Sequence, residues 1–349
     1  MSARRIMARR IAAWAFGLFA IPLSILPFYA YARYDGTGRI LSLEVMRHFR
    51  GPTLGSISKA DAARYRATHL GYHDGLLTLA FGGVMDGTTI DGPTPEATTI
   101  ATERFADDLR MLVAAGYHTV TPAQVAAWHA GRARLPANAV LLTFDGGRMD
   151  TTLNAAPIVR SLHLKAAVFM IGGAYRQAPV FYASPDQLRK LEHDGWSIQA
   201  HAISGHGSVD VGNGHRLPYL AARRVEHGAL ESLAAFSARV SEDYRDAKLA
   251  AERVAGAPVI AFSWPFGAYG ADHRTNDPAT ATINLRLARQ RFALGFNDDG
   301  QETYTVASRS GDPLRISRLR VDPTLTPHAL FERLELAIAA SGTIGHADA

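Results

Sequence analysis

Val140-Leu141-Leu142-Thr143-Phe144-Asp145-Gly146-Gly147 is the stretch that decides the fold. Its apolar and β-branched residues run directly into an aspartate, and two glycines end the run. This pattern predicts a buried strand whose carboxyl end delivers Asp145 to a solvent-facing rim. In barrels and open α/β sheets, that rim is where catalytic side chains gather. Taken alone, the pattern also fits a strand followed by an ordinary Asp-Gly turn.

Strand-like and helix-like segments alternate on both sides of this stretch. The expected strands are 76–81, 119–120, 166–171, 196–200, 259–264, 292–296 and 314–321. The expected helices are 102–115, 122–130, 151–162, 184–193, most of 217–255, and 327–340. Because parallel strands with helical crossovers produce this alternation, we expect an α/β fold, a closed or partly closed (β/α) barrel. The expected organisation is a signal segment (1–33), a linker or extension with some helix (34–75), the barrel (76–340) and a tail (341–349).

The composition is that of a folded protein with one large α/β domain. The chain has 349 residues, of which 47% are hydrophobic and 20% are charged. The net charge is +5, but no basic run suggests a groove for nucleic acid, so nucleic acid is not an expected partner. The absence of cysteine excludes disulfides, thiolate metal sites and a cysteine nucleophile.

An apolar run at 11–32 follows four arginines that lie within the first ten residues. The run has about the length needed to cross a hydrocarbon core of ~30 Å. The arginines should stay cytoplasmic, which places the rest of the chain outside the cytoplasm. Two fates remain open: a signal anchor retained in the inner membrane, or cleavage after Ala32 to give a periplasmic or secreted protein. Both predict a location in the cell envelope or beyond it.

Two histidines follow the strand expected at 196–200. His201 comes directly after it, and His206 comes five residues later in a loop that contains glycine. Such a loop can fold both imidazoles onto one centre, and neutral imidazoles are typical ligands of zinc and related divalent metals. The alternative is two exposed loop histidines, since the chain has 14 histidines in total.

A third stretch, Ser263 to Tyr269, also falls at the carboxyl end of an expected strand. Its Trp264, Pro265, Phe266 and Tyr269 suggest an aromatic-walled groove. A carboxylate, a metal and such a groove are what hydrolysis of an amide on a sugar requires. The metal polarises the carbonyl and lowers the pKa of its bound water, and the carboxylate takes the proton of that water.

The order of these motifs resembles that of the NodB-homology polysaccharide deacetylases, the family 4 carbohydrate esterases. The motifs are Leu-Thr-Phe-Asp-x-Gly, then the two histidines, then Trp-Pro-Phe-Gly-Ala-Tyr. The histidine spacing and the stretch 231–269 are similar to the deacetylases of biofilm poly-N-acetylglucosamine, and the likeness covers roughly 76–336. The resemblance implies a deformed (β/α) barrel and N-deacetylation of a polysaccharide that contains N-acetylhexosamine. It also implies a divalent, zinc-like metal held by one aspartate and two histidines, with a second aspartate as base.

Carried onto this sequence, the resemblance gives each motif a role. Asp145 falls on the catalytic base, and His201 and His206 fall on the metal histidines. Trp264, Pro265 and Phe266 fall on the groove-wall motif that binds substrate, with Tyr269 beside it.

The sequence departs from the family at several positions. Gly146 stands where the family has its metal-binding aspartate, and Ala202 follows His201 where the family prefers serine or threonine. The strand near 77–84 lacks the usual Tyr-His. No residue matches the family's late histidine acid, because His328 and His346 lie in the wrong context.

Three interpretations therefore stay open. In the first, the protein is an active deacetylase in which Asp145 itself ligates the metal, with water or another carboxylate such as Asp150 or Asp210 completing the shell. In the second, a catalytically impaired relative binds polysaccharide in the old groove, because glycine supplies no ligand at position 146. In the third, ranked last, carboxylates alone hydrolyse the bond, but the sequence defines no acid/base pair.

Overall fold

The computed structural model describes residues 55–85, 98–178, 181–298 and 304–342. The apolar run 11–32, the first part of the expected linker (34–54) and the tail beyond 342 lie outside these ranges. Within them, no helix combines the length and the apolar character that crossing a membrane demands.

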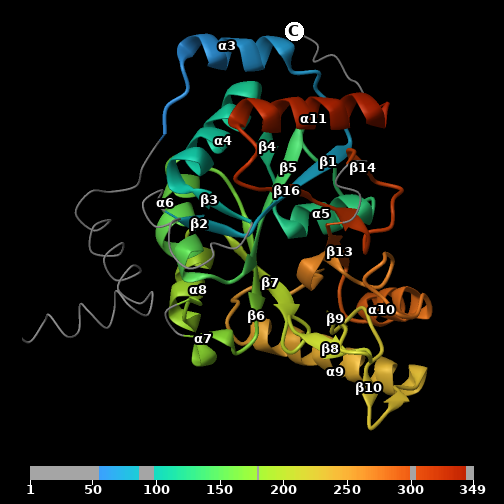
Figure 1. The fold of residues 1–349 in the computed structure, drawn as a ribbon. Helices are drawn as coiled ribbons and strands as arrows, with labels where there is room; N and C mark the ends of the chain where they lie inside the picture. Colours follow the sequence, from blue (N-terminus) through green and yellow to red (C-terminus); the bar gives the residue numbers. More distant parts are fainter. Residues whose placement is uncertain (1–54, 86–97, 179–180, 299–303, 343–349) are drawn as a thin grey trace, which may run out of the picture. The chain divides into compact units, whose positions relative to one another are not determined.

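A barrel-like sheet of mostly parallel strands forms the centre of the fold (Figure 1). Its order is β14-β1-β5-β6-β7-β12-β13-β15, with β16 paired to β1 and β4 paired to β5. The strands are β1 (Gly75–Phe81), β4 (His118–Thr119), β5 (Ala139–Gly146), β6 (Ala167–Ile171), β7 (Ser197–Ala202), β12 (Ala261–Ser263), β13 (Leu294–Asn297), β14 (Ala307–Ser308), β15 (Ile316–Ser317) and β16 (Leu319–Val321). The pairings are parallel except that β14 runs antiparallel to β1.

One short segment closes the sheet on itself. The strands β15 and β16 are separated by a single residue, Arg318. On one side β15 pairs with β13, and on the other β16 pairs with β1. The two edges of the sheet therefore meet at this segment, and the barrel is nearly closed, as the sequence predicted.

Helices flank the strands (Figure 1). They are α3 (Lys59–Thr68), α4 (Thr102–Ala115), α5 (Pro122–His129), α6 (Ala156–Ser161), α7 (Ala174–Gln177), α8 (Pro185–His193), α9 (Leu233–Glu252), α10 (Ala279–Arg289) and α11 (Pro327–Ser341), with a π-helical turn at Thr151–Ala155 before α6. The α4 bounds match the prediction. A capping box begins α8: the Ser184 side chain accepts from the backbone of Gln187, and the Gln187 side chain accepts from the backbone of Ser184.

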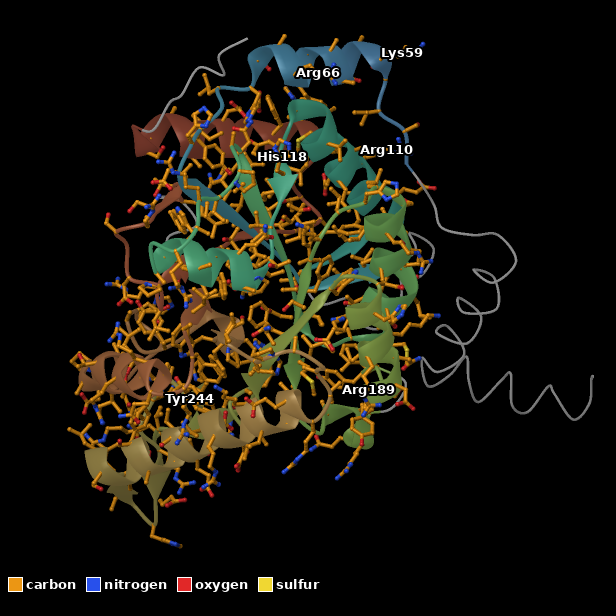
Figure 2. All side chains as sticks on the ribbon, turned by 180° about the vertical axis from the view of Figure 1, so that it is seen from behind. Lys59, Arg66, Arg110, His118, Arg189 and Tyr244 are labelled. Atoms are coloured by element: carbon orange, nitrogen blue, oxygen red, sulfur yellow. The ribbon has the colours of Figure 1, made fainter. Side chains whose placement is uncertain are left out.

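Buried aromatic side chains connect the long helix α9 to the sheet. Tyr244 lies on α9 (Figure 2), and its hydroxyl accepts a hydrogen bond from Trp264 Nε1 at 2.8 Å. The same hydroxyl donates to Asn284 Oδ1 of α10 at 2.5 Å. All three side chains are fully buried, and the polar atoms that they use in these hydrogen bonds have their partners inside the core.

The helix predicted over most of 217–255 is wrong in its first part. Short antiparallel pairs occupy that region: β8 (Ser208–Asp210) with β9 (Arg216–Pro218), and β10 (Val225–Glu226) with β11 (Ala229–Leu230). His227 and Gly228 both have positive φ, +51° and +77°, which is the geometry of a tight hairpin turn. The helix begins only after Ser232, whose side chain accepts from Ala235 N. A further small parallel pair joins β2 (Gly83–Met85) to β3 (Thr99–Ala101).

Candidate active site

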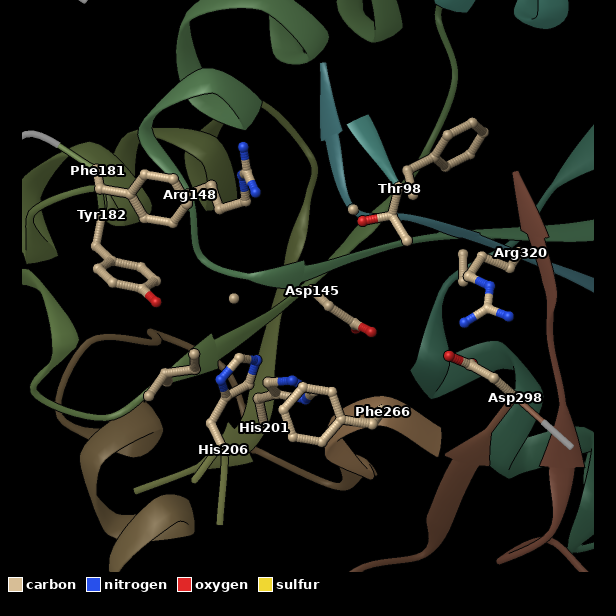
Figure 3. Close-up of a pocket in the computed structure, with 15 residues that line it drawn as sticks. Thr98, Asp145, Arg148, Phe181, Tyr182, His201, His206, Phe266, Asp298 and Arg320 are labelled. Atoms are coloured by element: carbon tan, nitrogen blue, oxygen red, sulfur yellow. The ribbon is translucent and has the colours of Figure 1, made fainter. Parts of the chain in front are cut away.

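A cavity of about 300 Å³ lies at the carboxyl ends of the barrel strands (Figure 3). Asp145 reaches it from β5, His201 from β7, and His206 from the loop after β7. The structure therefore brings together the acid and the two histidines that the sequence singled out. Further lining residues come from β1, β6 and β16 and from the loops after β12 and β13.

A buried arginine holds Asp145 in place. Arg318 Nη1 and Nη2 donate to the two carboxylate oxygens of Asp145 at 2.8 and 2.7 Å. This two-pronged geometry is the strongest that an arginine–carboxylate pair adopts. Burial by itself raises the pKa of Asp145, but the charge and hydrogen bonds of Arg318 outweigh it, so the pKa lies below its ordinary value. Asp145 is therefore ionised at neutral pH.

The two imidazoles lie side by side. His201 is buried within β7, which runs two residues further than the sequence predicted, and its Nδ1 is 2.8 Å from the carbonyl oxygen of Ser263. Because a carbonyl only accepts, Nδ1 carries the proton and Nε2 keeps its lone pair. Burial lowers the pKa of His201 to about 4, against the opposing charge of Asp145. The ring of His206 is centred 5.4 Å from that of His201 and 4.9 Å from that of Phe266.

A carboxylate on α9 fixes the loop between the histidines. Asp243 accepts backbone hydrogen bonds from Ser204 N at 2.6 Å and Gly205 N at 3.0 Å, with a longer one from Ile203 N. Burial raises the pKa of Asp243, while the same backbone amides oppose that shift. This aspartate thus sets where His206 can lie.

The residues present do not complete the three-ligand metal centre that the resemblance implies. Neutral His201, oriented by a backbone carbonyl, has the arrangement of a metal ligand, and His206 is beside it. Catalytic zinc sites use three protein ligands. Gly146 has no side chain, both oxygens of Asp145 accept from Arg318, and no trio of His, Cys, Asp or Glu side chains within the described ranges is placed to hold an ion.

The carboxylates suggested as substitutes have other partners. Asp150 is buried and paired with Arg148 at 2.9 Å. Asp210 lies on β8 and accepts from Gly212 N, and it is not part of the cavity lining.

Of the four residues predicted to bind substrate, Phe266 lies in the cavity wall. It is 46% exposed and has a positive φ of +60°, a strained conformation for a non-glycine residue. Trp264, Pro265 and Tyr269 are buried in the core behind it, because the chain turns inward after β12 to meet Tyr244. The opposite wall carries Phe181 and Tyr182, which the sequence did not single out.

Three residues that shape the site were also not identified from the sequence: Arg318, Asp298 and Asp243. Asp298 follows directly after β13, so the rule that picked out Asp145, a polar residue at the carboxyl end of a strand, would have found it. Arg318 and Asp243 sit inside an expected strand and an expected helix, where no motif marks them. The histidine His328, considered as an acid, lies on α11 and pairs with Glu332 at 3.1 Å.

Comparison with known proteins identifies a family to which part of this chain is similar. Residues 132–280 match the family model described as polysaccharide deacetylase. The chain carries a polysaccharide deacetylase domain. It is 27% identical over 125 residues, 36% of its own length, to the putative polysaccharide deacetylase YxkH of Bacillus subtilis (strain 168), and it spans 41% of that relative.

Solved structures of deacetylases share the fold. The de-N-acetylase from Aggregatibacter actinomycetemcomitans superimposes with a TM-score of 0.64 at 20% identity, over 75% of this chain and 100% of that one. IcaB from Ammonifex degensii gives a TM-score of 0.56 at 23% identity, over 74% of this chain and 97% of that one. Both likenesses support the deformed barrel predicted from the motifs.

Proposed function

We propose that the protein removes acetyl groups from a polysaccharide that contains N-acetylhexosamine, by hydrolysis of the amide C–N bond in the cavity at the carboxyl ends of the strands. The observation that carries the proposal is the meeting of Asp145, His201 and His206 on this one cavity, which is lined by Phe266 on one side and Tyr182 on the other. The deacetylase domain and the solved neighbours support the same chemistry.

Asp145 has the properties of a general base. It is ionised, it is held rigidly by Arg318, and it faces the cavity where a water molecule and the acetamido group would meet. A carboxylate in this state takes a proton from water as the oxygen attacks the acetyl carbon. Neutral His201 presents the Nε2 lone pair beside it. The zinc-like metal implied by the resemblance would have two imidazoles and no protein carboxylate, so no step is assigned to it.

One observation favours a second function, binding of the polysaccharide without turnover. A glycine at position 146 removes the only anionic ligand of the family's metal site, and the structure offers no replacement within the described ranges. In that case the aromatic walls at Phe266 and Tyr182 would still hold sugar rings.

Acetate release and oligosaccharide binding separate the two. Purified protein without the apolar segment, starting near residue 52, is incubated with N-acetylglucosamine oligomers, with and without added zinc, and metal content is measured in parallel. Acetate release that disappears in Asp145→Asn supports deacetylation. Binding of the oligomer by calorimetry without acetate in any condition supports the second function and refutes the first.

We also propose that the domain works in the cell envelope, outside the cytoplasm, joined to the membrane by residues 11–32 or released after Ala32. The arginines before that apolar run support this orientation. Fractionation of cells that express the full chain tests it: recovery with cytoplasmic markers would refute the proposal.

A further inference from the structure

A second carboxyl group faces the same part of the cavity as Asp145. Asp298 follows β13, and its side chain is 10% exposed at the cavity wall. Its Oδ1 accepts from Arg318 Nε at 2.9 Å and lies 2.8 Å from Nη2. The Nη1 and Nη2 atoms of the same arginine donate to Asp145. Figure 3 shows the two carboxyl groups turned toward one another across the cavity. One guanidinium thus holds both acids.

Among the residues that the structure describes, the buried charges around Asp298 do not balance if both acids are ionised. Arg318 is fully buried, and Asp145 is the other acid that it contacts. Arg320 on β16 also faces Asp298, but it is exposed, and solvent screens its charge. Two carboxylates that share one buried cation repel one another, and this repulsion favours a proton on one of them.

The proton belongs on Asp298 rather than on Asp145. Burial raises the pKa of Asp298; Arg318 opposes this, the charge of Asp145 adds to it, and the result lies above the ordinary value. The pKa of Asp145 is shifted the other way. Two carboxyl groups whose surroundings push their pKa values apart are the arrangement in which one serves as base and the other as acid.

We propose that Asp298 is the catalytic acid of this site and protonates the amide nitrogen of the substrate as the C–N bond breaks. The inference rests on the proposed deacetylation and names the acid that the sequence did not supply. It also gives the carboxylate-only interpretation the acid/base pair that it lacked.

Water oxygen bonds to the acetyl carbon, Asp145 takes one proton of that water, and the carbonyl electrons move onto oxygen. When this intermediate collapses, the carbonyl re-forms, the C–N bond breaks with its electron pair on nitrogen, and the proton of Asp298 bonds to that nitrogen. The products are a free amine on the sugar and acetic acid. Asp145 is then protonated and Asp298 ionised, and proton exchange through solvent restores both.

The need for an acid depends on the leaving group, which provides the test. A sugar amine leaves poorly unless it is protonated, whereas 4-nitrophenolate leaves without help. We therefore compare Asp298→Asn with the wild type on N-acetylglucosamine oligomers and on 4-nitrophenyl acetate. General acids contribute typically 10²–10⁴-fold, so we expect kcat/KM to fall at least about 100-fold on the amide and less than about 3-fold on the ester. The matched control, Asp312→Asn, removes an aspartate from an arginine pair at the surface and should change neither rate.

Equal losses on amide and ester, or no loss on either, would refute an acid role for Asp298. If the wild type releases no acetate from oligomers, the proposed deacetylation fails first, whatever the variant does. Should Asp298→Asn not fold, the pH profile of the wild type replaces it. The amide reaction should then lose rate as pH rises through the pKa of Asp298 while the ester reaction does not, and parallel profiles would refute the proposal.

Discussion

Restoring a carboxylate at position 146 tests whether this site has lost a metal ligand. The backbone at Gly146 has φ +92°, a region that L side chains rarely adopt. A Cβ added there would meet Arg148 Cγ at 3.4 Å and Tyr182 Cε1 at 3.8 Å, which are ordinary contacts with cavity-lining residues. The side chain therefore has room, and the cost of Gly146→Asp is the backbone conformation alone, about 1–2 kcal/mol of unfolding free energy.

Metal binding should offset that cost. With the introduced carboxylate as third ligand beside His201 and His206, zinc affinity should rise by at least about 100-fold, since even changes outside the first ligand shell shift affinity 10–100-fold. Zinc at about 100 times its Kd then stabilises the variant by about 2.7 kcal/mol. The measurement is urea unfolding of wild type and variant, each with zinc and with chelator, together with metal content after dialysis.

Gly146→Asn is the matched control, because it has the same shape and the same backbone conformation but no charge. It should be destabilised like Gly146→Asp in chelator and should gain much less from zinc. If zinc stabilises all three proteins equally, or none of them, position 146 does not complete a metal site, and the reasoning about Gly146 is refuted.

Three further outcomes follow from the buried charges. Arg318→Met leaves the Asp145 carboxylate without its buried cation and removes the donor to Asp298, and it should lower the unfolding free energy by about 3–5 kcal/mol; unchanged urea denaturation would contradict this. Because the folded-state pKa of Asp145 lies below its unfolded value, its contribution to stability is complete above the unfolded pKa and is lost as pH falls through the folded one. Asp145→Asn should therefore flatten the acid side of a stability–pH curve, and an unaltered curve would count against the pairing. Asp243→Ala leaves the backbone amides of Ser204 and Gly205 without their acceptor and should cost about 1–3 kcal/mol and weaken oligomer binding in calorimetry, unlike the neighbour variant Asp246→Ala, whose side chain is more exposed.

The sequence predicted the barrel because its signals are local. The strand that carries Asp145 is a continuous apolar run ended by glycines, and the capping box at Ser184 defines a helix start from two residues. The same logic failed over 217–232, where the apolar spacing of a helix competes with a turn at His227 and Gly228 that needs positive φ. Local turn chemistry decided that region.

The candidate site could be predicted only in part, because half of it depends on contacts between distant segments. Asp145, His201 and His206 stand in recognisable motifs. The partnership of Asp145 with Arg318 joins residues 173 positions apart, and no spacing rule reports it. Burial of Trp264 and Tyr269 behind Phe266 likewise depends on how the chain turns after β12, which motif content does not specify.

The place of Arg318 ties the architecture to the chemistry. It is the one residue between β15 and β16, where the two edges of the sheet meet. Its guanidinium also pairs with both acids of the cavity, Asp145 and Asp298. Any fluctuation that separates β15 from β13, or β16 from β1, withdraws the Arg318 guanidinium from Asp145 before the rest of the barrel unfolds. Heating should therefore abolish acetate release at temperatures where circular dichroism still reports an intact fold.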